Sequence, residues 1–309
     1  MKIVIVGPGA MGCLFAVFLS KTKEEIWLLD KNKERAQNLQ NGISVEGISG
    51  KWNAKPNVSA DPKEIGIADL IIIATKSYDT KPAITHAMPI IGQDSGILTF
   101  QNGIGNVEII GEIAGPDNVI AGITNLGATL IDDTHIRHAG NGETIIGKID
   151  GSNPVILRQI RELFNKVKLE TKISRDIKGV LWSKLIINVG INALGALTRL
   201  NNGRLTEFEG TRRILRDAVT EAVKIAKRKR IKLIYEDPLA KVEAVCEATA
   251  SNVCSMLQDV LKKRRTEIDF INGVVVRFGK ELGIPAPVNT ILVDLIKTIE
   301  SSYQFAVDR

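Results

Sequence analysis

The chain has 309 residues, 44% of them hydrophobic and 25% charged, which is long enough for two globular domains. No apolar run approaches the ~20 residues that cross a bilayer, and three cysteines without metal-ligand spacing fit a reducing cytoplasm, so we expect a cytoplasmic protein without a membrane partner. The net charge of +6 favours small anionic partners, and we expect no nucleic acid because the densest basic run, residues 227–232, has no interleaved aromatic residues.

The first predicted elements form a dinucleotide-binding fingerprint. A strand over residues 2–7 runs into Gly7-Pro8-Gly9-Ala10-Met11-Gly12, which opens a helix predicted over residues 10–19. In this context the first glycine permits a tight turn, the second lets the backbone approach a pyrophosphate, and the third allows the helix to pack closely on the strand. We therefore predict that these six residues bind a dinucleotide at the helix N-terminus.

A second predicted strand, over residues 25–30, ends on an acidic residue, and a charged helix follows over residues 31–40. Asp30 lies where a carboxylate accepts hydrogen bonds from an adenosine ribose and repels a 2′-phosphate, which favours NAD(H). Basic residues of the helix either offset that repulsion or form a solvated surface: Lys31, Lys33 and Arg35. From these residues alone the choice between NAD(H) and NADP(H) stays open.

The next strands are predicted over residues 69–75, 96–100 and 119–123, with helical patterns between the later ones. Such alternation indicates a parallel sheet, whose ligands bind at the carboxyl ends of the strands. Two residues follow such ends: Lys76 could reach a cofactor phosphate or ribose, and Asn102 could orient the nicotinamide or the substrate. Turn chemistry would also explain either residue alone.

One segment imitates a phosphate-binding loop. Residues 142–148 match the spacing of a P-loop, but Ile149 stands where a Ser or Thr would bind magnesium, and residues 144–146 have a strand pattern. We reject a P-loop here. The three histidines and the carboxylates show no ligand clustering either, so we predict no metal.

From about residue 173 the pattern becomes helical, with helices predicted over 177–199, 208–230, 238–262 and 266–282 and a last helix after the break at 283–287. We therefore predict an α/β fold class: a Rossmann domain over residues 1–170 and an all-helical domain over residues 171–309.

Within the first of these helices, three polar residues recur at four-residue spacing in an almost wholly apolar stretch: Lys184, Asn188 and Asn192. On a helix they share one face. A lysine among Ile, Leu and Val must be paired, neutralised or directed at a cleft, whereas a surface helix would leave it solvated. Beside a nicotinamide cofactor, Lys184 could protonate a carbonyl oxygen and stabilise the developing alkoxide.

A later segment adds a carboxylate. Thr266 followed by Asp269 predicts an N-cap, which places Glu267 in the first turn of a new helix, and favourable interaction with the helix dipole would explain Glu267 locally. Ser255 could be a cap of the same kind.

Together these residues resemble the ketopantoate reductase (2-dehydropantoate 2-reductase) family over essentially the whole chain. The resemblance rests on the glycine loop, Lys76, residues 101–103, the stripe from Lys184 to Asn192, and most specifically on residues 255–259 with 266–269, Ser-Met-Leu-Gln-Asp and Thr-Glu-Ile-Asp. It implies an enzyme with a Rossmann domain joined to a helical domain like that of 6-phosphogluconate dehydrogenase, with the active site in the cleft between them.

The resemblance also implies roles. Lys184 would be the proton donor in the reduction of 2-dehydropantoate to (R)-pantoate, in the pantothenate branch of coenzyme A synthesis, and Glu267 would bind the substrate hydroxyl or help to hold the lysine and the cofactor. The residues implied to bind substrate are Asn102, Asn188, Asn192, Asn202 and Ser255; those implied to line the cofactor, beside the glycine loop, are Lys76, Asn102, Ala128 and Glu267. Asp30 joins the cofactor set from its position at the end of the second strand. The family usually uses NADP(H) and often has a basic residue where this chain has Asp30, so NAD(H) remains an alternative.

Three other functions are compatible with parts of the pattern. A β-hydroxyacid dehydrogenase shares the glycine loop and the Lys-x-x-x-Asn pair, but it lacks the Thr-Glu-Ile-Asp block and has a glycine-rich substrate loop not found near residues 122–128. A paralogue could reduce another 2-keto acid. An NAD(P)-binding sensor or regulator would need no proton donor. The sequence is also compatible with a homodimer.

Overall fold

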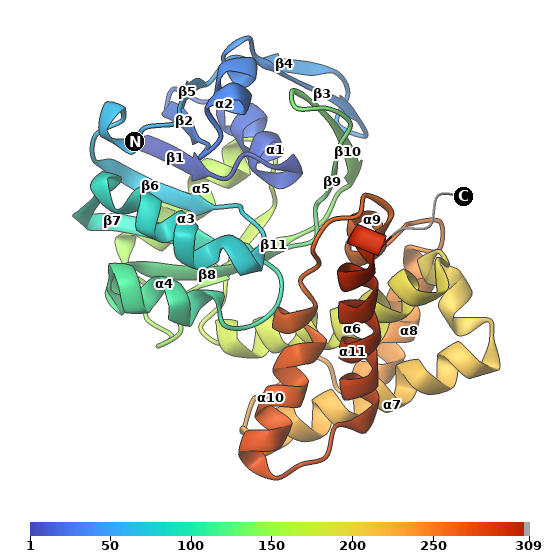
Figure 1. The fold of residues 1–309 in the computed structure, drawn as a ribbon. Helices are drawn as coiled ribbons and strands as arrows, with labels where there is room; N and C mark the ends of the chain where they lie inside the picture. The colour runs from blue at the N-terminus through green and yellow to red at the C-terminus, as the bar shows by residue number, and fades with distance from the viewer. Residues whose placement is uncertain (306–309) are drawn as a thin grey trace. The chain divides into compact units, whose positions relative to one another are not determined.

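The computed structural model describes residues 1–305, and the chain divides into two compact units (Figure 1). The N-terminal unit comprises Met1–Gln101 and Gly105–Ile177, and the helical unit comprises Asn102–Ile104 and the chain from Lys178 onward. The sequence predicted a division after residue 170. The structural division lies a few residues later, and it also assigns Asn102–Ile104 to the helical unit, because Ile104 N–H donates to the Phe270 carbonyl at 3.0 Å.

The main sheet of the N-terminal unit has, within residues 1–305, eight strands in the order β12-β11-β8-β7-β6-β1-β2-β5. Every neighbouring pair is parallel except β8 and β11. The strands are β1 (Lys2–Val6), β2 (Glu25–Leu29), β5 (Asn57–Ser59), β6 (Ala68–Ile73), β7 (Ile91–Thr99), β8 (Val119–Thr124), β11 (Thr144–Gly147) and β12 (Thr171–Ile173). From β5 to β8 the strand order is that of a Rossmann fold, which confirms the predicted α/β class.

Helices cover both faces of this sheet. Alternate residues of the central strands enter different cores, because side chains alternate across a strand. Ile3, Ile5 and Leu70 pack with α1 (Ala10–Leu19) and α5 (Val155–Lys166). Val4, Val6 and Ile71 pack with α3 (Thr80–Ala87) and α4 (Asn106–Ala114) on the other face. Burial on both faces explains why these strands are continuous apolar runs.

A second, four-stranded sheet was not predicted. Its order is β4-β3-β10-β9, with bounds β3 (Ile43–Gly47), β4 (Trp52–Ala54), β9 (Gly127–Leu130) and β10 (His135–Gly140). It contacts α1 (Figure 1). The central pair, β3 and β10, joins Ser44 to His135, and a pairing so distant in sequence leaves no local pattern.

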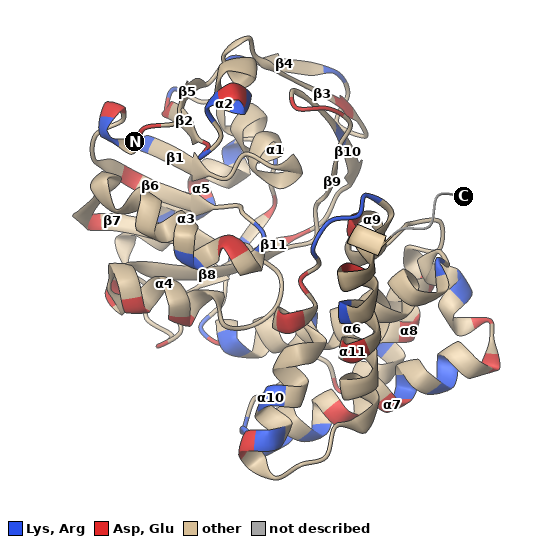
Figure 2. Cartoon of the chain, in the orientation of Figure 1, with Lys and Arg blue, Asp and Glu red and all other residues tan. Residues whose placement is uncertain are grey.

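The helical unit packs around α6 (Ile177–Thr198), which is apolar enough and long enough to pass for a membrane span, although 72% of that stretch is buried inside the protein, as in a core helix. Around it lie α7 (Glu209–Arg228), α8 (Pro238–Ala248), α9 (Ser255–Leu261), α10 (Asn272–Leu282) and α11 (Pro287–Ser302). A side chain at Gly190 would meet Val219 at 3.0 Å and Val242 at 2.9 Å, so glycine lets α7 and α8 approach α6 closely. Charged residues of both signs line α7 and α10 (Figure 2).

Two predicted helices are wrong in extent. The helix predicted over 238–262 is interrupted between α8 and α9, because the carbonyls of Ala250 and Asn252 accept hydrogen bonds from the backbone of Gly203 and Asn202. The helix predicted over 266–282 begins only at Asn272, as α10. It is preceded by a 3-10 turn over Ile268–Phe270, after which Ile271 leaves helical geometry.

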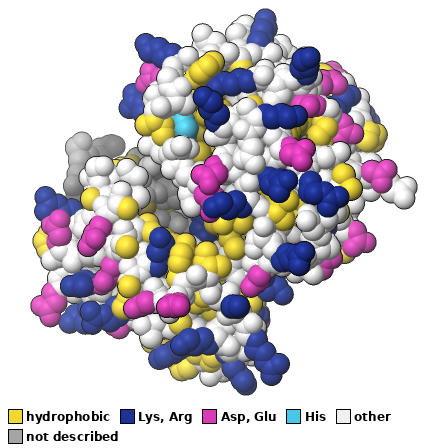
Figure 3. Space-filling view, turned by 180° about the vertical axis from the view of Figure 1, so that it is seen from behind, with side chains coloured by type: hydrophobic (Ala, Val, Ile, Leu, Met, Phe, Trp, Pro, Cys, Tyr) yellow, Lys and Arg dark blue, Asp and Glu magenta, His cyan; other side chains and the backbone are white. Residues whose placement is uncertain are grey.

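The surface carries its charge in a mixed pattern. In the view of Figure 3, Lys and Arg side chains are scattered among Asp and Glu side chains and apolar residues. The net charge of +6 is therefore not gathered into one field on this face.

Candidate functional site

The glycine loop has the geometry that its glycines predict. Gly7 has φ +79°, and a Cβ there would lie 2.2 Å from the Thr75 side chain; a Cβ on Gly12 would lie 2.8 Å from the Gly7 carbonyl oxygen. A Cβ on Gly9 would meet nothing within 4 Å. Gly7 and Gly12 are thus required for the turn and for packing, while Gly9 presents bare backbone to open space. No side chain caps α1, which begins immediately after Gly9.

One carbonyl fixes the outer part of this loop. The Pro8 oxygen accepts hydrogen bonds from the Cys13 thiol at 3.0 Å and from the Arg35 guanidinium. Burial raises the pKa of Cys13 to about 12, which disfavours the nucleophilic thiolate. An uncapped helix N-terminus behind a fixed, bare loop fits a dinucleotide pyrophosphate.

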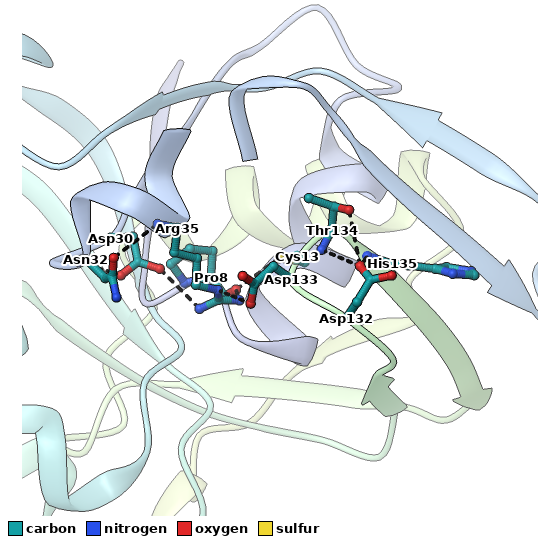
Figure 4. A network of polar contacts seen from close by, with 9 residues as sticks. All are labelled: Pro8, Cys13, Asp30, Asn32, Arg35, Asp132, Asp133, Thr134 and His135. Atoms are coloured by element: carbon teal, nitrogen blue, oxygen red, sulfur yellow. Dashed lines mark hydrogen bonds and ion pairs between the residues drawn. The ribbon is translucent and has the colours of Figure 1, made fainter. Parts of the chain in front are cut away.

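Asp30 directly follows β2 and is bound on two sides (Figure 4). It accepts a hydrogen bond from the Asn32 backbone N–H at 3.0 Å and another from Arg35 at 3.1 Å. Arg35 lies in α2 (Lys33–Gln40), whose N-cap is Asn32. Asp133, in the turn between β9 and β10, lies 3.4 Å from the Nε atom of Arg35. The predicted ribose-binding residue and a cation are therefore paired here.

A polar network fixes the loop that contains Lys76. The Gln101 amide, after β7, lies within hydrogen-bond distance of the Thr75 carbonyl (3.0 Å) and of the Thr80 hydroxyl (2.9 Å). Asn106 accepts from Thr80 at 2.7 Å and donates to the Ser77 hydroxyl at 3.2 Å. Gln101 entered the resemblance without a role of its own and Asn106 was not singled out; the available signal was their place beside Asn102, after a strand end.

The predicted polar stripe lies on one helix. Lys184, Asn188 and Asn192 are all in α6, with Lys184 and Asn188 partly buried and Asn192 buried. Burial lowers the pKa of Lys184 to about 8, although the Glu267 carboxylate acts in the opposite direction. The side chains of Asn188 and Asn192 lie on the same side of α6 as Lys184, as the four-residue spacing predicts.

Glu267 is 5% exposed and lies near Lys184. It accepts a hydrogen bond from the Asn102 amide at 3.3 Å, across 165 residues of sequence. The prediction that Thr266 caps an α-helix is wrong: its hydroxyl accepts from Ile268 N–H at 3.2 Å, which starts only the 3-10 turn. Three predicted residues, Lys184, Glu267 and Asn102, are thus brought together by segments far apart in the chain.

The remaining predicted residues occupy different settings. The buried Asn202 amide donates to the Thr249 hydroxyl at 2.9 Å, and its carbonyl oxygen has no hydrogen-bond partner. Ser255 is the exposed first residue of α9, and the cap is Cys254, whose sulfur accepts from Leu257 N–H. Ala128 is partly buried in β9, opposite His138.

A buried network behind α6 was not predicted from the sequence. Asn272 donates to the Val189 carbonyl of α6 at 3.2 Å and to Asn289 at 2.9 Å. Asn289 donates in turn to Glu221 at 2.7 Å, and Glu221 accepts the first N–H groups of α11. The signal was an asparagine or glutamate on each of three apolar helix faces. This network holds the helix turn that carries Asn188.

Two further predictions concern ligands. The residues that imitate a P-loop form β11, as expected for a strand. Among residues 1–305, no group of three or more His, Cys, Asp or Glu residues is arranged to hold a metal ion.

Comparison with known proteins gives consistent matches along the chain. Residues 3–151 match the family described as "Ketopantoate reductase PanE/ApbA", and residues 176–300 match its C-terminal part. The 2-dehydropantoate 2-reductase of Pyrococcus horikoshii is 36% identical over 302 residues, which are 97% of this chain and 98% of the relative.

Solved structures share the whole fold. A PanE/ApbA family ketopantoate reductase from Ralstonia eutropha aligns with a TM-score of 0.91 and 30% identity over 98% of this chain and 100% of that one. D-mandelate dehydrogenase in complex with NADH and anilino(oxo)acetate aligns with a TM-score of 0.90 and 26% identity over 98% and 99%.

Proposed function

Because the chain belongs to the ketopantoate reductase family, we propose that it reduces 2-dehydropantoate to (R)-pantoate with a nicotinamide dinucleotide. The observation that carries this proposal is Lys184, a partly buried lysine near the buried carboxylate of Glu267, with a pKa of about 8. The reaction places the protein in the pantothenate branch of coenzyme A synthesis. We propose a cytoplasmic location, which is supported by three free cysteines in the described chain.

The chain's own residues account for the protons and for positioning. A bound nicotinamide dinucleotide supplies the hydride for the keto carbon. The Lys184 ammonium donates a proton to the carbonyl oxygen, which becomes the hydroxyl of the product, and the lysine is left neutral. A pKa near 8 suits this step, because the group is charged at neutral pH and gives up its proton readily. Glu267 favours the protonated lysine before the transfer.

The other residues bind and orient. Residues 7–12 would hold the pyrophosphate, Asp30 the adenosine ribose, and Lys76 a phosphate or ribose oxygen. Asn102, Ala128 and Glu267 would line the nicotinamide end. Asn188 and Asn192 offer amides beside Lys184 to the substrate; Asn202 and Ser255 complete the substrate set by family resemblance.

A second candidate is the reduction of another 2-keto acid by the same residues. The alignment with D-mandelate dehydrogenase over nearly the whole chain supports this alternative. A steady-state assay with 2-dehydropantoate, run in parallel with NADH and NADPH, distinguishes the two. We expect turnover with at least one cofactor, and the absence of turnover with both would favour the other keto acid.

Replacing Lys184 tests the mechanism. We expect Lys184→Ala to lower kcat by ~10²-fold or more, because proton donation is lost, while the Kd for the dinucleotide is retained. Lys178→Ala is the matched control, since Lys178 is an exposed lysine of the same helix. Near-normal turnover of Lys184→Ala would contradict the assignment of the proton donor.

A further inference from the structure

The Arg35 guanidinium is held on three sides (Figure 4). One terminal nitrogen donates to the Asp30 carboxylate at 3.1 Å, and the other donates to the Pro8 carbonyl of the glycine loop. The third nitrogen, Nε, lies 3.4 Å from an oxygen of Asp133. These partners come from three separate segments: the end of β2, the glycine loop, and the turn between β9 and β10 of the second sheet.

Asp133 contributes charge to this arrangement. The buried Nε atom of Arg35 makes no hydrogen bond, so its interaction with Asp133 is an ion pair at 3.4 Å. The Asp30 side chain is 9% exposed and that of Arg35 is 21% exposed, so their mutual attraction is only weakly screened by solvent. The Asp133 side chain is 52% exposed, so solvent screens its attraction to Arg35 more strongly, and Asp133 is the outer of the two carboxylates. Two carboxylates therefore face one guanidinium, and the cluster carries a net charge of about −1.

We infer that Asp133 is a specificity-determining residue, which retains Arg35 against Asp30 and thereby makes the adenosine end of the site selective for NADH over NADPH. This inference rests on the proposed function, because it concerns the cofactor of that reaction. It involves a residue of the β9–β10 turn, which lies far in sequence from the strand–turn–helix fingerprint that begins the chain.

The two cofactors make opposite demands on this cluster. A ribose 2′-hydroxyl donates a hydrogen bond, and each Asp30 oxygen retains capacity for one more, since each already accepts only one. A 2′-phosphate brings nearly two negative charges and requires a guanidinium that can offer two N–H groups. Each terminal nitrogen of Arg35 already donates one hydrogen bond, and the approach of a phosphate would oppose two carboxylates.

The neighbouring lysines lie further out in solvent than Arg35. Lys31 is 72% exposed and lies 3.5 Å from Asp79, a pairing that solvent screens strongly. Lys33 is also exposed. Arg35 contacts both Asp30 and the glycine loop, so a change in its pairing acts directly at the predicted ribose position.

Binding measurements without any keto acid test the inference. Kd values for NADH and for NADPH are measured by titration calorimetry on the full chain and on Asp133→Asn. The wild type should bind NADH more tightly. Asp133→Asn keeps the shape of the side chain but removes its charge, so the ratio of Kd(NADPH) to Kd(NADH) should fall by about tenfold, with Kd for NADH changing less than twofold.

Two further variants isolate the cause. Asp132→Asn is the matched control, because the neighbouring Asp132 caps its own turn by accepting from Thr134 and His135, which an asparagine oxygen also does. The ratio of Kd(NADPH) to Kd(NADH) for Asp132→Asn should equal that of the wild type. Adding Arg35→Gln to Asp133→Asn should abolish the gain in NADPH affinity, since the gain requires the released guanidinium.

The outcomes separate the two proposals. A wild type that prefers NADPH, or a ratio that Asp133→Asn leaves unchanged, overturns the inference and leaves the proposed reductase activity standing. Failure to bind either dinucleotide contradicts both. A shifted ratio in a protein that does not turn over 2-dehydropantoate supports the inference and contradicts the proposed substrate.

Discussion

Lys184 shows how a single residue is adjusted by two opposing surroundings. Burial disfavours its charge, and the carboxylate of Glu267 favours it, with burial the stronger influence. The outcome is a lysine that changes its charge near the pH at which enzymes work, where an ordinary lysine titrates above pH 10.

This adjustment predicts a pH profile. For reduction of the keto acid, kcat/KM should be level at neutral pH and fall above about pH 8, because the proton donor must carry its proton and loses it as pH rises through the pKa. Glu267→Gln should move the falling limb to lower pH, since the carboxylate holds the pKa up. The measurement is kcat/KM from pH 6 to pH 10.

Lys178→Ala serves as the control, and the falling limb of its kcat/KM profile should lie at the same pH as that of the wild type. A limb that stays in place in Glu267→Gln would show that Glu267 does not act on the titrating group.

For single residues, the sequence identified the chemically important side chain better than it identified the residues that contact it. Lys184 could be selected because a lysine on an apolar helix needs an explanation. Its pairing with Glu267 joins Lys184 to a distant segment, and the hydrogen bond from Asn102 to Glu267 spans 165 residues, so no local pattern records either contact. Gln101 resembled an ordinary loop residue because its partners, Thr75 and Thr80, lie after another strand, in a loop and at the start of α3.

At the scale of elements, four helix ends are followed by a residue with unusual backbone geometry. Four basic residues have left-handed backbone geometry: Lys168, Arg199, Arg230 and Lys263, with φ between 50° and 64°. After α5 and α7 this geometry completes the helix end, since Leu169 N–H donates to Phe164 and Ile231 N–H donates to Ala226. Glycine is the residue that adopts it without steric cost.

Glycine at these ends should therefore stabilise the protein. We expect Lys168→Gly and Arg230→Gly each to raise the free energy of unfolding by about 1 kcal/mol, because the side chain opposes positive φ. The measurement is the urea midpoint at unchanged slope. Lys224→Gly, at an exposed position inside α7, is the control and should destabilise by about 1 kcal/mol. A loss of stability at both helix ends would contradict the argument.

The elements differed in how well their sequence described them. The bounds of α1 were predicted at both ends, because a glycine loop begins it and its apolar run ends at Leu19. The break between α8 and α9 was not predicted, because it depends on hydrogen bonds to Asn202 and Gly203. The second sheet was not predicted because its strands are short and pair with distant partners.

At the scale of the whole molecule, the division of the chain is not a single cut. Asn102–Ile104 belong to the helical unit, although the residues on either side belong to the N-terminal unit. Gly103 packs closely against the backbone of Phe270. It has φ +83°, and a Cβ there would lie 2.2 Å from the Phe270 carbonyl oxygen. No rearrangement of a flexible side chain relieves such a contact, because the opposing atom is backbone.

A methyl group at this position should therefore be costly. We expect Gly103→Ala to lower the free energy of unfolding by about 2–4 kcal/mol, from positive φ and from collision with Phe270. Gly210→Ala, in α7, is the matched control: a Cβ there meets nothing within 4 Å, and stability should hold or rise by up to about 1 kcal/mol. Thermal unfolding of both variants is the measurement, and equal stabilities would contradict the proposed constraint.

During synthesis, the same three residues are made well before the residues that they contact. Asn102 leaves the ribosome 165 residues before Glu267, an interval of roughly ten to thirty seconds at ordinary rates of translation. N-terminal domains generally fold first, so the sheet can assemble while Asn102, Gly103 and Ile104 still await their partners. A chain released before Phe270 would contain the strands of the N-terminal sheet but would lack the carbonyl that accepts the hydrogen bond from Ile104.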